Sequence, residues 1–114
     1  KERLFNTFKA MCMDSDQIKL FGANLSCEGI SSSLIGQEIE VKIGFSDIVL
    51  KDNESEGLVG GSVKYILYKG NHYHLTIYTD DNQYVFADTN DIWDEGDRVG
   101  VSIASAKAIR VIES

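Results

Sequence analysis

Two histidines, His72 and His74, lie two positions apart in a run that alternates polar and apolar residues. Side chains at i and i+2 of a strand point to the same face, so both imidazoles are predicted to share one face. A pair of imidazoles can bind a transition metal, but a closed site needs about four ligands. The sequence supplies no third ligand at a fixed spacing, so the pair is interpreted as two polar residues of a strand, and no metal is expected.

An acidic cluster surrounds Trp93 and consists of Asp88, Asp91, Asp94, Glu95 and Asp97. It does not match the calcium-binding loop, which needs acidic or amide residues at alternate positions, a Gly and a distal Glu. Asp and Gly together are typical of turns, so residues 94–97 are predicted to reverse the chain, with Trp93 covering one end of a barrel. Attraction of a cation is the alternative reading of the same carboxylates.

Catalytic patterns are missing. Residues 57–64 are rich in glycine but lack the Gly-Lys-Ser/Thr order of a phosphate-binding loop and lead into a strand pattern, so the glycines are expected to permit a bulge or close strand packing. Neither the serines at 31–33 nor Cys12 and Cys27 have a histidine nearby in sequence to act as a base. We therefore predict no catalytic residue, no cofactor and no enzymatic activity for this chain.

The composition fits a single folded domain. The 114 residues are 43% hydrophobic, and 18 acidic against 11 basic residues give a net charge of −7. A nucleic-acid-binding protein needs a basic surface to neutralise phosphates, so nucleic acid is not an expected partner. No apolar run approaches the ~20 residues of a membrane span. Cys12 and Cys27 do not form a metal-binding or redox pair by spacing and are expected to be buried thiols.

Alternation with a period of two residues dominates the chain and predicts strands. It is strict over residues 38–43, 72–79 and 98–103. Weaker strands are expected over 8–13, 17–21, 23–27, 47–51, 62–68, 83–87 and 108–112. Short Asp/Asn/Gly segments separate them, as in antiparallel hairpins, and a single helical turn is expected over 30–35 or 90–94. The predicted fold class is all-β, an antiparallel barrel with little or no helix.

An internal similarity divides the chain into two related β units. Residues 36–43 align with residues 96–103, and each segment is followed by a short apolar strand. The acidic segment 52–57 lies between them and is interpreted as a linker. We therefore expect one domain over residues 1–114 that is built from units at about 5–51 and 57–114.

Residues 63–75 carry a more specific pattern, in which a strand enters Lys-Gly, turns, and leaves through His72 and Tyr73. This segment resembles the transport-associated OB (TOBE) regulatory domain at the C-terminus of the ATP-binding protein of spermidine/putrescine-type ABC importers. The resemblance continues through residues 85–91 and 96–100 and extends back to residues 4–8 and 37–43. Its motif residues are Gly70, His72, Tyr73, Gly96 and Asp97.

The resemblance implies an OB-like barrel with regulatory and dimerisation functions and no reaction of its own. Implied partners are a second copy of the subunit, the subunit's own upstream ATPase domain and the membrane permease subunits, on the cytoplasmic side of the bacterial plasma membrane. ATP and magnesium would bind in that upstream domain.

Two further functions remain open. In a small-ligand sensor, a polyamine would bind Tyr73, Trp93, Asp94 and Asp97 by charge and cation–π contact. An OB-type nucleic-acid-binding module would stack bases on exposed aromatic rings, but it needs a positive groove that the composition does not indicate.

Overall fold

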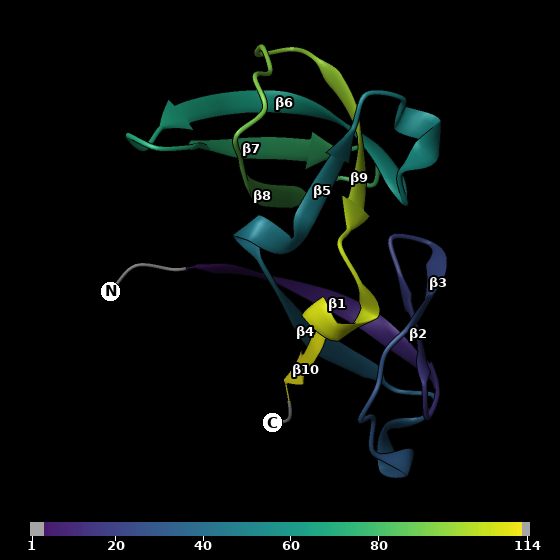
Figure 1. Ribbon diagram of the computed structural model, residues 1–114. Coiled ribbons are helices and arrows are strands. Elements are labelled where there is room, and N and C mark those ends of the chain that lie inside the picture. Colours follow the sequence, from purple (N-terminus) through teal and green to yellow (C-terminus); the bar gives the residue numbers. More distant parts are fainter. Residues whose placement is uncertain (1–3, 113–114) are drawn as a thin grey trace.

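The computed structural model describes residues 4–112 and contains two five-stranded antiparallel sheets (Figure 1). The first sheet has the strand order β10-β4-β1-β2-β3, and the second has the order β5-β9-β6-β7-β8. The strands of the first sheet are β1 (Phe5–Asp14), β2 (Gln17–Leu20), β3 (Ala23–Ser26), β4 (Glu38–Gly44) and β10 (Arg110–Ile112). Those of the second are β5 (Ile48–Lys51), β6 (Val59–Tyr68), β7 (Tyr73–Thr79), β8 (Tyr84–Thr89) and β9 (Arg98–Ile103). The all-β fold class predicted from the alternation is confirmed.

Helical structure in residues 4–112 consists of four single 3₁₀ turns, η1 (Ser32–Leu34), η2 (Phe45–Asp47), η3 (Glu54–Glu56) and η4 (Ala106–Ala108). The turn expected within residues 30–35 is confirmed by η1. The alternative at 90–94 was wrong, because Asp91 there bonds back to the Thr89 side chain and the chain then continues without a helical turn. None of these turns has the length and apolar character that a membrane crossing requires.

The two units expected from the sequence exchange their last strands, so that each pairs in the sheet of the other unit. β5 follows β4 in sequence but pairs with β9, and β10 follows β9 but pairs with β4. The connections are the short turns η2 and η4, which carry the chain from one sheet to the other (Figure 1). The predicted boundary at 52–57 therefore places β5 in the first unit, with β1–β4, although β5 pairs with β9 of the second unit. The descent of both units from one repeat stays a prediction.

One hydrophobic core joins both sheets. The alternation predicted for β4 places Ile39, Val41 and Ile43 inside, and Val99 and Val101 of β9 are also buried. The β7 positions Leu75 and Ile77 complete the same cluster from the second sheet. Full burial of each such side chain contributes about 1.5–3 kcal/mol, so this shared core is the main force that holds the exchanged sheets together.

Three glycines permit close strand packing. A Cβ on Gly57 would lie 2.5 Å from the Val101 backbone nitrogen, and one on Gly100 would lie 2.9 Å from the Asn53 carbonyl oxygen. A Cβ on Gly61 would lie 2.9 Å from Ile77 Cγ2. The expectation of close packing for the glycine-rich segment is confirmed, and the segment leads into β6 rather than into a helix.

The β2–β3 hairpin turns earlier than the sequence pattern predicts. Phe21, expected to end the strand, has a φ of 55° and is followed by Gly22 with a φ of 79°. Positive φ at both central residues is the signature of the two-residue turn whose twist matches antiparallel strands. β2 therefore ends at Leu20, and the Phe21 ring packs edge-on to Phe8 at 5.0 Å instead of extending the strand.

A buried amide connects the two sheets. Asn6 on β1 is 4% exposed, and its Oδ1 accepts a hydrogen bond from the Phe86 backbone nitrogen at 2.8 Å. Its Nδ2 donates to the Phe86 carbonyl oxygen at 2.9 Å and to the Ile43 carbonyl oxygen at 3.3 Å. The side chain thus forms both bonds that a neighbouring strand would form with the β8 edge. It satisfies backbone groups that would otherwise be costly to bury.

Replacement of Asn6 is expected to destabilise the domain more than its size suggests. Asn6→Ala leaves the Phe86 backbone groups without partners and should lower the free energy of unfolding by roughly 2–4 kcal/mol in urea denaturation. Asn6→Asp should be no milder, because a carboxylate cannot donate to either carbonyl. The adjacent exposed Thr7→Ala is the control and should cost under about 1 kcal/mol. Equal losses for Asn6→Ala and Thr7→Ala would contradict the bridging role.

Candidate functional site

The motif residues of the β6–β7 hairpin shape its turn. Gly70 has a φ of 97°, which favours glycine, and its carbonyl oxygen accepts a hydrogen bond from the Tyr68 hydroxyl at 2.7 Å. The Lys69 nitrogen donates to the His72 carbonyl oxygen at 2.8 Å and closes the loop. Tyr73 packs on the core, with its ring centre 5.1 Å from that of Tyr68.

The predicted reversal at residues 94–97 is present. The Asp97 carboxylate accepts from the Asp94 backbone nitrogen at 2.8 Å, and the Asp97 nitrogen donates to the Asp94 carbonyl oxygen at 3.0 Å. The turn also binds β6, since the Gly96 nitrogen donates to the Val63 carbonyl oxygen and the Val63 nitrogen donates to the Asp97 carbonyl oxygen. These bonds lie beside the irregular pairing of β6 and β7 between Val63 and Tyr65. Asp97 therefore fixes the path of the chain at this bulge.

The four residues proposed to bind a polyamine lie in different surroundings. Trp93 is half-buried against the core, and its Nε1 is buried with no hydrogen-bond partner in the described part of the chain. Asp94 is exposed, while Asp97 is engaged in the turn. No contact recorded for residues 4–112 joins Tyr73 to the other three. Polyamine binding by this set stays a prediction.

The two histidines share a carboxylate that the sequence did not single out as their partner. His74 Nδ1 lies 2.7 Å from Asp88 Oδ1, and His72 Nε2 lies 3.5 Å from Asp88 Oδ2. The His74 ring stacks on Phe86 with 5.7 Å between ring centres and contacts Phe45 at 5.0 Å. A cavity of about 360 Å³ opens beside this cluster. The cross-strand pairing of His74 with Asp88 on β8 decides this contact, and it is invisible in the sequence spacing.

The hydrogen bonds of the two imidazoles fix their ring orientation. His74 Nδ1 bonds to the Asp88 carboxylate, and His72 Nδ1 faces Asn71 Oδ1 at 2.5 Å. Across residues 4–112 there is no group of three or more His, Cys, Asp or Glu residues that could hold a metal ion.

Both cysteines are fully buried and unpaired. Burial raises the pKa of the Cys27 thiol, and the neighbouring Cys12 and Glu28 add to this effect. A raised pKa keeps the thiol protonated and poorly nucleophilic. The expectation that these cysteines are buried is confirmed.

An exposed apolar surface lies on the second sheet. Side chains on strands β6, β7 and β8 alternate between the core and what we call the outer face, which carries Ser62, Tyr65, Leu67, His74, Thr76, Tyr78, Tyr84, Phe86 and Asp88. Tyr65, Leu67 and Tyr84 are 67%, 56% and 58% exposed. Contiguous exposed aromatic and aliphatic side chains of this kind mark interaction surfaces in soluble proteins.

Comparison with known proteins identifies the chain's relatives. It is 46% identical over its whole length to the spermidine/putrescine import ATP-binding protein PotA of Bacteroides fragilis and 44% identical over 113 residues to PotA of Bacteroides thetaiotaomicron. The chain is homologous to a part of PotA. It spans 24% of the length of either relative. No family model matches the chain.

The fold has a close counterpart among solved structures. The molybdate-bound form of the cytoplasmic molybdate-binding protein ModG superimposes with a TM-score of 0.69, over 93% of this chain and 94% of that chain. The sequences are only 13% identical, so the likeness concerns the fold alone. The fold is TOBE-like, as the resemblance of residues 63–75 implied.

Arg98 organises a polar network that sequence reasoning missed in this PotA-like chain. Its guanidinium contacts Asp80 twice, with Nη1–Oδ1 at 3.0 Å and Nη2–Oδ2 at 2.6 Å, and its Nε contacts Glu54 Oε2 at 2.8 Å. Nη1 also donates to Ser62 Oγ at 3.0 Å. The network ties the 52–57 segment and the β7–β8 loop to β9. Gly60 leaves room for it, because a Cβ there would lie 2.8 Å from Asp80 Oδ2.

Arg98 is expected to make stability depend on pH. Its hydrogen bonds lower the pKa of Asp80 below the ordinary value of 3.8. A depressed carboxyl pKa stabilises the folded state fully above that ordinary value, and the contribution disappears as pH falls through the folded pKa. Arg98→Gln should therefore lower Tm modestly at pH 7. The difference in Tm between this variant and the unsubstituted chain should become smaller as the pH is lowered, which thermal unfolding at several pH values measures.

The control for Arg98 is Lys9→Gln. Lys9 lies 3.9 Å from Glu38 between exposed side chains, and its loss should leave Tm unchanged throughout. A deficit in Arg98→Gln that stays constant through the acidic range would mean that Arg98 acts by packing alone.

Proposed function

We propose that the chain is a non-catalytic regulatory and dimerisation region of the ATP-binding subunit of a bacterial polyamine importer. Homology to PotA over the whole chain supports the importer context. The TOBE-like fold and the location of the glycine-rich segment in β6 support a role in contact rather than in nucleotide hydrolysis. In this proposal the ATPase motifs lie in another part of the subunit, which would bind ATP and magnesium.

The outer face is the observation that carries the dimerisation part. Its exposed Tyr65, Leu67 and Tyr84 come from strands whose opposite face contributes Val63, Val85 and Ala87 to the core. Association would bury this apolar area, and a few large side chains at the centre of an interface usually supply most of the binding energy. A second copy of the subunit is the partner that we propose.

The importer context sets the other proposed partners. The chain would lie peripherally on the cytoplasmic side of the bacterial plasma membrane, next to its own ATPase domain and near the permease subunits. Its net charge of −7 favours solubility at that location and opposes contact with nucleic acid.

Self-association tests this function. Sedimentation at graded concentrations should show the 114-residue chain forming a dimer, and Leu67→Ser with Tyr65→Ser should weaken it by roughly tenfold or more through lost apolar burial. Ile35→Ser, which removes an exposed apolar residue outside the sheets, is the matched control and should leave the dimer unchanged. A chain that remains monomeric at high concentration would contradict the dimerisation proposal.

Polyamine sensing is the second candidate. The exposed Asp94 carboxylate beside the half-buried Trp93 ring is the observation that favours it, because ammonium groups bind carboxylates and aromatic faces. Calorimetry with spermidine should then show saturable heat that Asp94→Asn reduces, whereas Asp52→Asn in the exposed 52–57 segment should not change it. If calorimetry shows no binding heat at about millimolar spermidine, the chain is not a polyamine sensor.

A further inference from the structure

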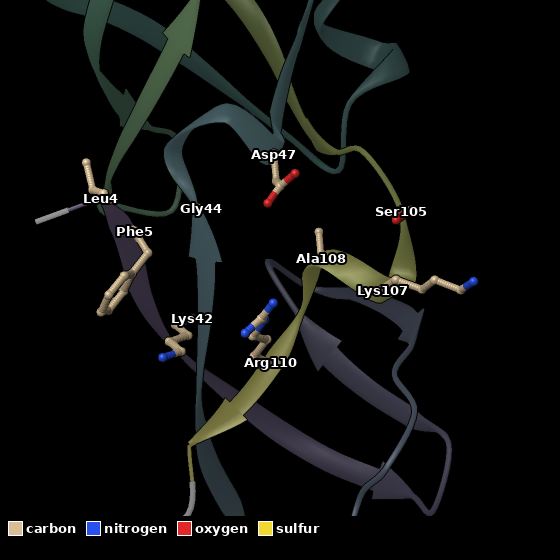
Figure 2. A pocket seen from close by; sticks show the side chains of 9 residues that line it. All are labelled: Leu4, Phe5, Lys42, Gly44, Asp47, Ser105, Lys107, Ala108 and Arg110. Carbon is tan, nitrogen blue, oxygen red and sulfur yellow. The ribbon is translucent and has the colours of Figure 1, made fainter.

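A second cavity, of about 430 Å³, lies where β1, β4 and β10 meet the turns η2 and η4 (Figure 2). It shares Leu4 with the cavity beside the histidine cluster, but none of its lining residues belongs to the outer face. Leu4, Phe5 and Ala108 supply apolar lining, and Lys42, Arg110 and Asp47 supply charge. Its volume falls in the range of roughly 300–1,000 Å³ that is typical of sites for small organic molecules, and it is much larger than one bare inorganic anion requires.

Two positive charges oppose each other at this cavity. Lys42 and Arg110 are direct cross-strand partners in the pairing of β4 with β10. Like charges placed directly opposite each other destabilise a sheet. Within residues 4–112 neither side chain forms an ion pair, although the chain has 18 acidic residues that could have supplied one. The arrangement is unfavourable for folding and suited to an anionic ligand.

A negative charge lies across the cavity from Arg110. Figure 2 shows the Asp47 carboxylate pointing into the cavity from η2, toward the side chain of Arg110. A Cβ on Gly44 would lie 3.0 Å from Asp47 Oδ2, so the glycine leaves room for this orientation. The Lys42 amine lies 4.8 Å from the centre of the Phe5 ring, which holds it at the rim of the cavity. Lys107, in contrast, points away.

The charges define the ligand. Lys42 and Arg110 match two carboxylates, and Arg can bind a carboxylate with two parallel hydrogen bonds. Asp47 accepts a hydrogen bond from a donor group and repels a fully deprotonated anion. The sum of the three side chains is one positive charge, which a ligand with two carboxylates and one ammonium group would neutralise. The apolar lining leaves space for its carbon chain.

We propose that this cavity binds a small acidic amino acid, with its carboxylates on Lys42 and Arg110 and its ammonium group on Asp47. The ligand would relieve the repulsion between the two cations and connect β10, the last strand of the chain, to the η2 turn at which the chain crosses between the sheets. Binding would therefore act on the junction of the two sheets.

L-glutamate is the probe, and binding is followed by calorimetry and by amide chemical shifts of the 114-residue chain. Saturable shifts should centre on residues 42–47 and 105–110. Lys42→Gln and Arg110→Gln should each weaken binding by about tenfold, as expected for loss of one charge-assisted hydrogen bond. Lys107→Gln is the control, because it removes a positive charge whose side chain points away from the cavity. This variant should bind glutamate as tightly as the unsubstituted chain does.

Comparison ligands test the role of Asp47. Glutarate has the two carboxylates but no ammonium group, and it should bind about tenfold more weakly than glutamate. Asp47→Asn should abolish this preference. Equal binding of sulfate and glutamate, or equal binding of glutarate and glutamate, would overturn the assigned ligand class. Shifts produced only by an acidic peptide, and not by free glutamate, would also overturn it.

Thermal unfolding supplies an independent readout. Without ligand, Lys42→Gln or Arg110→Gln should raise Tm, because each removes one charge of a like-charged cross-strand pair. The same variants should lose the stabilisation that glutamate confers on the unsubstituted chain. A lowered Tm in both variants would show that the two cations are structural and would overturn the proposal.

Discussion

The Asn6 side chain joins the two sheets by taking the place of a missing strand beside β8. β8 is an edge strand of the second sheet and contacts β1, and a buried backbone edge needs partners. The amide of Asn6 supplies a donor and an acceptor at Phe86 and reaches Ile43 as well. A side chain with only one of these two capacities could not serve both groups. The common core of the two sheets can then close around this contact.

The exchange of strands also explains where the polar sites lie. η2 and η4 cross between the sheets at one side of the molecule, and they bring Asp47 opposite Arg110 and Lys42. On the second sheet, close approach at Gly60 lets Arg98 reach Asp80 and Glu54. Lys42 therefore meets Arg110 only because the chain returns to the first sheet, whereas Arg98 meets its partners within the second sheet. β5 and β10 both pair with strands of the same chain, β9 and β4.

Much of the fold could be predicted from local patterns. Strict alternation located β4, β7 and β9 to within a residue or two, and Asp/Gly chemistry located the turn at 94–97. The start of β6 was placed three residues late, because Gly60 and Gly61 interrupt the apolar pattern there. The strand predicted over 17–21 ends one residue early, because Phe21 adopts a positive φ and packs on Phe8.

The sequence by itself determined the class of the protein: a β domain whose alternating side chains must bury one face, whose charge opposes nucleic acid, and whose hairpin motif resembles importer regulatory domains. Only the tertiary structure decided which charges meet. Asp88 reaches His74 through cross-strand pairing, and Lys42 faces Arg110 because β10 returns to the first sheet. Period-two patterns specify which face a side chain occupies, but they carry no information on which strands become neighbours, since that depends on how the whole core closes.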